Sequence, residues 1–219
     1  MRPTICKFRH LLEQHGLGEK IFGAVNAHLK EKGVSVGTGT IVDATIIDAP
    51  SSTKNEKRER DPEMHSTRKG NQWYFGMKAH IGVDSTSKIV HTLVTTAANV
   101  HDSKVLPDLL HGNETRVWGD SAYVGQTDVM RAKAPCAQDF TNKRAYRNRP
   151  LSDDEKQANR HKSSTRSRVE HVFGIVKGMF GFQKVRYRGL AKNKNRLYVC
   201  LALANIFVQK KQLTRFAGA

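Results

Sequence analysis

The clearest apolar run of the chain is residues 39–48, where six of the ten side chains are β-branched. The run ends at Ala49-Pro50, and its length and composition are typical of a strand that is buried on both faces. Asp43 stands in the middle of it. Because an unpartnered ionised carboxylate is very unfavourable inside a protein, Asp43 needs a cation, a cluster of hydrogen bonds or a cleft at a sheet edge. The alternative is a locally capped aspartate at a strand end.

The pattern on either side of this run predicts two helices before it and a hairpin after it. Residues 8–15 and 19–32 are predicted helices, and a pair of packed helices is the commoner meaning of such a pattern, with a helix-turn-helix as the alternative. Loose alternation over 74–83, a polar turn and the run 88–95 predict antiparallel strands. The polar stretch 51–72 has no apolar period, so we expect a mobile loop there.

Short elements of alternating type follow the hairpin. They are a helix at 102–110, a strand at 115–118, a helix at 125–133 and a strand at 136–141. Pro107 falls inside the first of these helices and is expected to shorten or bend it. The order of elements indicates an α/β fold in which helices flank a mixed sheet.

The last third of the chain is predicted to be mainly helical. Ser152 and Glu155 form a capping box that opens a helix after Pro150. A second helix is expected over 165–179, where apolar side chains form a firm stripe. A closing helix carries the apolar run 197–208.

The charge of the chain favours a polyanionic partner. There are 37 lysines and arginines against 20 acidic residues, a formal net charge of +17. Nucleic acid is the simplest such partner, although ribosomal or membrane-surface association would need the same sign of charge. No acidic residue follows Glu170, whereas ten basic residues do, so this region is the candidate DNA-binding region. Its candidate contacts are Lys184, Arg186 and Arg188. The aromatic residues nearby either stack on bases or belong to the core: Phe180, Phe182 and Tyr187.

Several classes of protein find no support. Cys6, Cys136 and Cys200 are odd in number and form no CxxC pair, as expected for reduced thiols of a cytosolic protein. The longest apolar run is shorter than the roughly 20 residues that span a bilayer, and no signal-peptide core is visible. We therefore expect a soluble cytoplasmic protein without a membrane partner. Zinc motifs and Walker-type glycine loops do not occur.

Asp120 and Glu170 are two further carboxylates at positions that suggest function. Asp120 comes just beyond the predicted strand 115–118, and ligand sites gather at such carboxyl ends of strands. Glu170 borders the apolar stripe of its predicted helix, with Arg166 and Lys177 on the same face. The alternatives are a solvated turn or helix cap for the aspartate and an ordinary surface salt bridge for the glutamate.

Together, Asp43, Asp120 and Glu170 could meet across the end of one sheet. Hard oxygen ligands of this kind suit Mg²⁺ or Mn²⁺. Two such ions, about 4 Å apart, can activate a water or a 3′-hydroxyl and stabilise the leaving oxygen in phosphodiester transfer. Arg166 and Lys177 would then face DNA phosphates. The combination of a basic chain and an acidic cluster suits a DNA-cutting enzyme.

Five segments of the sequence carry a family resemblance. They are TIVDAT (40–45), NQWYFGMK (71–78), ANVHD (98–102), WGDSAY (118–123) and RSRVE (166–170), the last followed by Lys177. These segments resemble the DDE transposases of bacterial insertion sequences, of the insertion-sequence-five type within the broad insertion-sequence-four superfamily. The resemblance extends from about residue 8 to residue 209. It implies a ribonuclease-H-like fold, two divalent ions held by Asp43, Asp120 and Glu170, strand transfer between DNA ends and target, and a homo-oligomer assembled on DNA.

The chain departs from the family pattern at one position of a related motif. That motif places Tyr, Arg, Glu and Lys at fixed spacing, and Arg166, Glu170 and Lys177 keep the spacing. Ser163 stands at the tyrosine position, so an aromatic side chain that would stack on a base is missing there.

The N-terminal part is the second departure. Residues 1–36 resemble only the tail of a longer DNA-binding and dimerisation region, so we expect a truncated copy in which 37–219 form the catalytic domain. The leading interpretation is a transposase. A metal-dependent nuclease of the same fold and an inactive remnant that only binds DNA are the alternatives.

Overall fold

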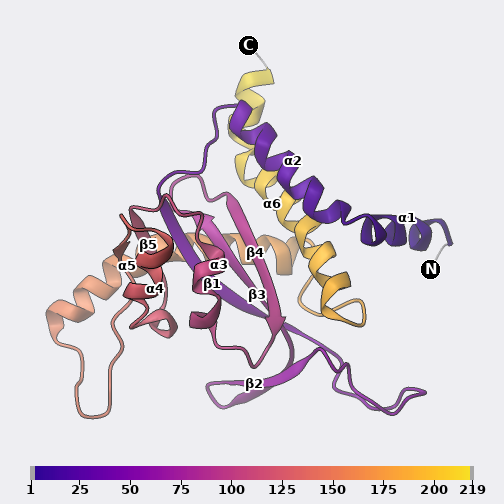
Figure 1. Cartoon of the computed structure of the whole chain (residues 1–219), viewed down its shortest axis with the longest axis horizontal. Coiled ribbons are helices and arrows are strands. Elements are labelled where there is room, and N and C mark those ends of the chain that lie inside the picture. Colours follow the sequence, from indigo (N-terminus) through magenta and orange to yellow (C-terminus); the bar gives the residue numbers. More distant parts are fainter. Residues whose placement is uncertain (1–2, 218–219) are drawn as a thin grey trace.

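Strand β1 (Gly39–Asp48) is the central strand of a six-stranded sheet in the computed structural model, which describes residues 3–217 (Figure 1). It is buried on both faces, because Ile41 and Val42 are fully buried and belong to two different hydrophobic clusters. The predicted two-sided strand is therefore confirmed, and Asp43 lies within it.

Strand β3 (Gln72–Asp84) pairs antiparallel with β1 on one edge and with β4 (Val90–Ala97) on the other, which confirms the predicted hairpin. The first part of β3 also pairs with β2 (His65–Lys69). The loop predicted over 51–72 is wrong for this segment. Strand β2 is almost entirely exposed and is held by its ladder of backbone hydrogen bonds, so it needs no apolar period.

The opposite side of the sheet is parallel. Strand β5 (Arg116–Trp118) pairs with β1, and β6 (Gln138–Asp139), shorter than the strand predicted there, pairs with β5. Four short helices lie in the connections: η1 (Asp102–Val105), α3 (Leu106–Leu109), η2 (Ser121–Tyr123) and α4 (Thr127–Lys133). Pro107 occupies the second position of α3, where its missing N–H is not needed, so the predicted helix is divided into a 3₁₀ turn and a short α-helix.

Helix α5 (Asp153–Gly174) begins at the predicted capping box of Ser152 and Glu155, with both reciprocal hydrogen bonds formed. The sequence predicts two helices in this part, but α5 is continuous and runs into the π-helical segment η3 (Ile175–Met179). The basic segment after η3 then leads to α6 (Leu190–Ala217), which contains the predicted closing helix.

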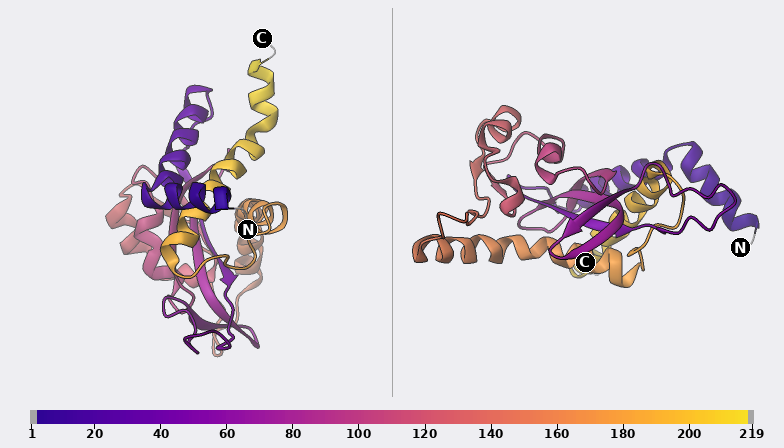
Figure 2. Two further views of the ribbon diagram at one scale, coloured as in Figure 1. Left: turned by 90° about the vertical axis from the view of Figure 1, so that its right-hand side faces the viewer. Right: turned by 90° about the horizontal axis from the view of Figure 1, so that it is seen from below.

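The N-terminal helices α1 (Pro3–Gln14) and α2 (Leu17–Glu31) pack on the C-terminal helix, and α2 lies along α6 (Figures 1 and 2). The rings of Phe22 and Tyr198 have their centroids 5.5 Å apart. The backbone N–H of Gly18 donates to Oδ1 of Asn195 at 3.0 Å, and a side chain at Gly18 would collide with that asparagine.

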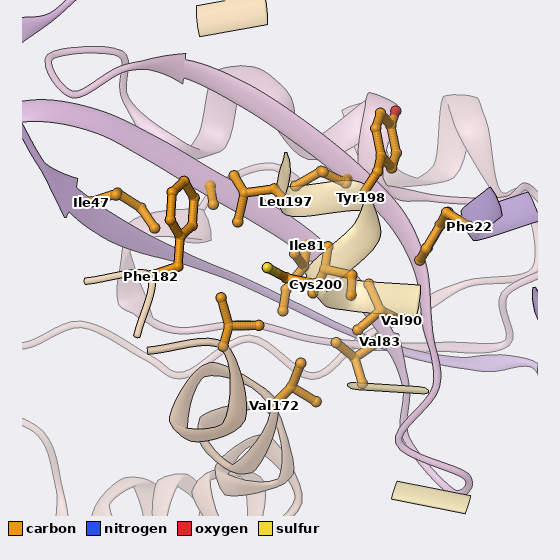
Figure 3. Close-up of a cluster of buried hydrophobic side chains, with 14 of the residues drawn as sticks. Phe22, Ile47, Ile81, Val83, Val90, Val172, Phe182, Leu197, Tyr198 and Cys200 are labelled. Carbon is orange, nitrogen blue, oxygen red and sulfur yellow. The ribbon is translucent and has the colours of Figure 1, made fainter. Parts of the chain in front are cut away.

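The helices cover the two faces of the sheet in separate groups (Figure 2). The larger core, on the face of α2, α5 and α6, includes Phe22, Val172, Phe182 and Leu197 (Figure 3). The smaller core lies under α3 and α4 around Tyr123. This arrangement confirms the predicted α/β class and is consistent with a ribonuclease-H-like fold. Within residues 3–217, no helix has the length and apolar character needed to cross a membrane.

Candidate active site

Asp43 lies in the middle of β1, and its side chain is 16% exposed. Its Oδ1 accepts a hydrogen bond from the backbone N–H of Ala44 at 2.8 Å, and its Oδ2 accepts one from Nη1 of Arg166 at 3.0 Å. Burial raises the pKa of this carboxyl from its ordinary 3.8 to about 6, although both of these contacts act to lower the pKa. The charges of Asp120 and Asp102 also raise it, so three carboxylates act on one another here.

Asp120 reaches the same region from the end of β5. Because β5 runs parallel to β1, with Trp118 opposite Ile41, the residues that follow it lie beside the middle of β1. Oδ1 of Asp120 caps the 3₁₀ turn η2 by accepting a hydrogen bond from the N–H of Ala122 at 2.9 Å. Asp120 is therefore a helix cap through its Oδ1, as the alternative interpretation held. The same side chain also lines the cleft that contains Asp43.

Glu170 comes from α5, and its side chain is 65% exposed. Its Oε1 lies 4.0 Å from Nη2 of Arg166, one helical turn earlier, so the expected surface pair is present. Arg166 thus contacts both Asp43 and Glu170. The three predicted carboxylates come from three separate elements and line one cleft with a volume of about 480 Å³.

The acidic side chains of this cleft are not gathered into a ready metal site. Among residues 3–217, no three His, Cys, Asp or Glu side chains lie close enough to hold one ion, and the Arg166 guanidinium contacts both Asp43 and Glu170. The donor set nevertheless suits a hard divalent cation, because it consists of carboxylate oxygens. Asp43 is buried beside two like charges, and a divalent ion would relieve that repulsion. The residues therefore fit Mg²⁺ or Mn²⁺.

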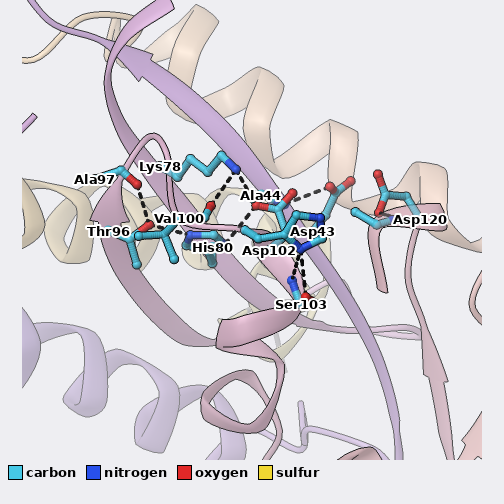
Figure 4. A network of polar contacts seen from close by, with 12 residues as sticks. Asp43, Ala44, Lys78, His80, Thr96, Ala97, Val100, Asp102, Ser103 and Asp120 are labelled. Carbon is cyan, nitrogen blue, oxygen red and sulfur yellow. Dashed lines mark hydrogen bonds and ion pairs between the residues drawn. The ribbon is translucent and has the colours of Figure 1, made fainter. Parts of the chain in front are cut away.

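A fourth carboxylate, Asp102, lines the same cleft and is missing from the predicted site. The sequence pattern predicts only a helix start there, but His101 caps η1 and Asp102 turns toward β3 (Figure 4). Its Oδ1 accepts a hydrogen bond from Nζ of Lys78 at 2.8 Å and lies 3.7 Å from Nδ1 of His80. Asp102 could have been found by the criterion that identified Asp120, because each is an acidic residue that comes shortly after the end of a strand.

Lys177 lies in η3 and is half-buried, and its Nζ donates to the backbone carbonyl of Ile46 at 2.8 Å. Burial lowers the pKa of this amine, and the nearby charge of Lys69 acts in the same direction. Lys69 and Arg68, both from β2, line the cleft. The sequence pattern does not single out these two basic residues, because it predicts a loop in place of β2.

Three basic residues of the candidate DNA-binding region are exposed and alternate along the chain after η3: Lys184, Arg186 and Arg188. The segment is anchored beside the end of β1, because the N–H of Val185 donates to the carbonyl of Asp48 at 2.8 Å. Phe182 is fully buried, so the core alternative is correct for this aromatic residue.

Comparison with known proteins gives this geometry a context. Residues 35–206 match a family model described as the transposase DDE domain. A cryo-EM structure of the piggyBac transposase synaptic complex with hairpin DNA is similar in fold, with a TM-score of 0.51 and 12% sequence identity. The likeness covers 84% of this chain but 49% of that one, so the chain spans about half the length of that transposase. With the family match extending over most of its length, the chain belongs to the transposase DDE domain family.

Proposed function

We propose that this protein is a transposase of the insertion-sequence type, which cuts the ends of a DNA element and joins them to a target with Mg²⁺ or Mn²⁺ as cofactor. The observation that carries the proposal is the shared cleft. Asp43, Asp120 and Glu170 line it from β1, the end of β5 and α5, in a chain that belongs to the transposase DDE domain family.

Asp43, Asp120 and Glu170 are the residues proposed to hold the divalent ions. When bound, such ions activate a water or a 3′-hydroxyl and stabilise the leaving oxygen of a phosphodiester. Asp43 and Asp120 are each held by a backbone N–H, whereas Glu170 is largely exposed and free to adjust. Arg166 is in contact with two of the three carboxylates, and its planar guanidinium suits a DNA phosphate bound over the cleft.

DNA is the proposed substrate and partner. Arg68 and Lys69 add positive charge to the cleft, and Lys184, Arg186 and Arg188 stand exposed beside the end of β1. Binding should weaken with salt along a log–log slope of about −0.9 per phosphate contacted. Replacing Lys184, Arg186 and Arg188 together by alanine should make that slope shallower by about 2.7 if each contacts one phosphate. An unchanged slope would remove them from the proposed interface.

We also propose that the chain assembles as a homo-oligomer on DNA, with residues 1–36 contributing to DNA binding or dimerisation. Supporting this, α1 exposes the apolar side chains of Ile5, Phe8 and Leu11, of which Phe8 is 61% exposed. Light scattering with and without a terminal-repeat duplex tests the assembly. A chain that remains monomeric on such DNA at all protein concentrations contradicts it.

The decisive experiment is a cleavage and joining assay on terminal-repeat DNA with Mg²⁺ or Mn²⁺. Asp43→Asn and Asp120→Asn should each lose at least about 100-fold in rate, because metal binding supplies several kcal/mol of transition-state stabilisation and each 1.36 kcal/mol is tenfold. Asp108→Asn, a change at an exposed aspartate of α3, is the matched control. Near-normal rates in either cleft variant would refute the assignment.

Two other functions give different products in the same assay. A metal-dependent nuclease of this fold would cut the DNA without joining its 3′ ends to a target. One observation favours a protein that only binds DNA. Arg166 forms an ion pair with Asp43, and among residues 3–217 no three acidic, His or Cys side chains lie close enough to hold a metal ion. Tight, salt-sensitive binding without cleavage in either metal would select that function.

A further inference from the structure

Asp102 lies at the start of η1 but does not cap it. It is the first residue of η1, and the capping hydrogen bond is accepted instead by Nδ1 of His101 at 3.3 Å. The Asp102 carboxylate is therefore available to the cleft, which it lines together with Asp43 and Asp120.

Two side chains of β3 lie beside this carboxylate, and one of them, Lys78, hydrogen-bonds it (Figure 4). Nζ of Lys78 donates at 2.8 Å both to Oδ1 of Asp102 and to the carbonyl of Val100, so it fixes the turn and the acid together. His80 is fully buried, and its Nε2 contacts Oγ1 of Thr96 at 2.8 Å. Its Nδ1 lies 3.7 Å from Oδ1 of Asp102 and has no hydrogen-bond partner. A buried, unpartnered polar atom thus points at this carboxylate.

The second oxygens of Asp102 and Asp120 are both uncommitted. In each residue Oδ1 accepts a hydrogen bond, from Lys78 and from the N–H of Ala122 respectively. Neither Oδ2 accepts a hydrogen bond from any residue in the range 3–217. Both carboxylates line the cleft with Asp43, so two free oxygens remain there for a cation.

We propose that Asp102 is a fourth carboxylate ligand of the divalent-metal site, held in place by Lys78. This inference rests on the proposed metal-dependent function. The competing explanation is a salt bridge that only ties the turn after β4 to β3.

Mn²⁺ binding to the full chain without DNA, followed by calorimetry, separates the two explanations. Asp102→Asn keeps the size of the side chain and an oxygen acceptor for Lys78, and it should lower the Mn²⁺ affinity by at least about tenfold. Asp108→Asn, on the exposed surface of α3, should leave the affinity unchanged. Wild-type Mn²⁺ affinity in Asp102→Asn would overturn the proposal.

A second variant covers the case in which Asp102→Asn does not fold. Lys78→Gln combined with Asp102→Asn removes both charges, so no unpaired charge is left in the interior. This double variant should show the same loss of Mn²⁺ affinity, and wild-type affinity in it would again overturn the proposal.

Asp43→Asn distinguishes a failure of this inference from a failure of the proposed function. If Asp43→Asn loses Mn²⁺ affinity and both Asp102 variants keep it, only the role of Asp102 is wrong. If Asp43→Asn also binds Mn²⁺ like the wild type, the proposed metal site itself is wrong.

Discussion

Glu114 packs against β1 and Asp43 lies within it, and the two acids have opposite surroundings. Glu114 is fully buried, and its carboxylate accepts hydrogen bonds from two backbone N–H groups and a hydroxyl, with Nε2 of His111 3.4 Å from Oε1. The N–H of His111 donates to Oε1 at 2.7 Å, the N–H of Gly112 donates to Oε2 at 2.8 Å, and the hydroxyl of Thr40 donates to Oε1 at 3.2 Å. Both of its oxygens are therefore committed to holding the loop before β5 against β1.

Asp43 lies three residues after Thr40 on the same strand, but it has one backbone donor and one arginine, and it faces the carboxylates of Asp102 and Asp120. Burial, reinforced by these two like charges, raises its pKa to about 6. Burial alone therefore does not distinguish the acid proposed to bind metal from an acid that stabilises the fold. A buried carboxylate whose two oxygens are taken up by donors of its own loop and strand stabilises the fold, whereas Asp43, which lies among like charges with Arg166 as its cationic partner, would be stabilised further by a bound cation.

The largest expected difference between the two acids is catalytic. Asp43→Asn should reduce DNA cleavage by at least about 100-fold, since a proposed metal ligand is lost. Folded Glu114→Gln protein should cleave at close to the wild-type rate, because Glu114 faces the loop before β5 and does not line the cleft. Equal losses of rate per folded molecule in the two variants would break the comparison.

The next effect is the pH dependence of stability. The pKa of Asp43 is raised on folding from 3.8 to about 6, so its ionised form disfavours the fold by about 2 to 3 kcal/mol. Below pH 4 both states are protonated and the penalty is absent; it grows between pH 4 and 6 and is complete above pH 6. Urea unfolding in EDTA should therefore show Asp43→Asn gaining stability relative to the wild type as the pH rises from 4 to 7. A difference that stays constant across this range would contradict the raised pKa.

A smaller effect is expected for Glu114 itself. Glu114→Gln replaces one acceptor oxygen with an NH₂ group that faces a backbone donor, so charge-assisted hydrogen bonds are lost. The free energy of unfolding should fall by about 2 kcal/mol at pH 7. Glu170→Gln, at the largely exposed glutamate of α5, is the control and should change it by less than about 0.5 kcal/mol. No loss in Glu114→Gln would mean that its hydrogen bonds do not stabilise the fold.

The smallest effect tests one donor of the Glu114 cluster. Thr40→Val keeps the shape of a fully buried side chain and removes the hydroxyl that donates to Glu114 at 3.2 Å. The free energy of unfolding should fall by about 1 kcal/mol, as measured by urea unfolding. Thr45→Val, on the same strand, is the control and should have a smaller effect. A larger loss of stability in Thr45→Val would show that the change reflects the loss of any threonine hydroxyl from β1 and not the loss of the hydrogen bond to Glu114.

Several elements could be predicted from the sequence because short-range interactions specify them. The β-branched run of β1, the strand predicted in β3 and the capping box of Ser152 and Glu155 were each confirmed, although β3 is buried along most of its length and does not alternate. Strand β2 was missed because it is exposed and held by pairing with β3, which leaves no local pattern. Asp102 was missed because its sequence position suits a helix cap, a role that His101 takes in the fold.

The sequence by itself determined which acids stand at strand interiors and ends, and that the chain carries the basic charge expected of a DNA partner. Only the tertiary structure decided which charges meet. Arg166 contacts Asp43 across 123 positions of sequence, and Asp102 reaches the cleft through the order of β4, β3 and β1. The physical reason is the different sequence range of the interactions involved. Periodicity and capping act over a few residues, whereas the electrostatics of a cleft depend on every group that the sheet brings together.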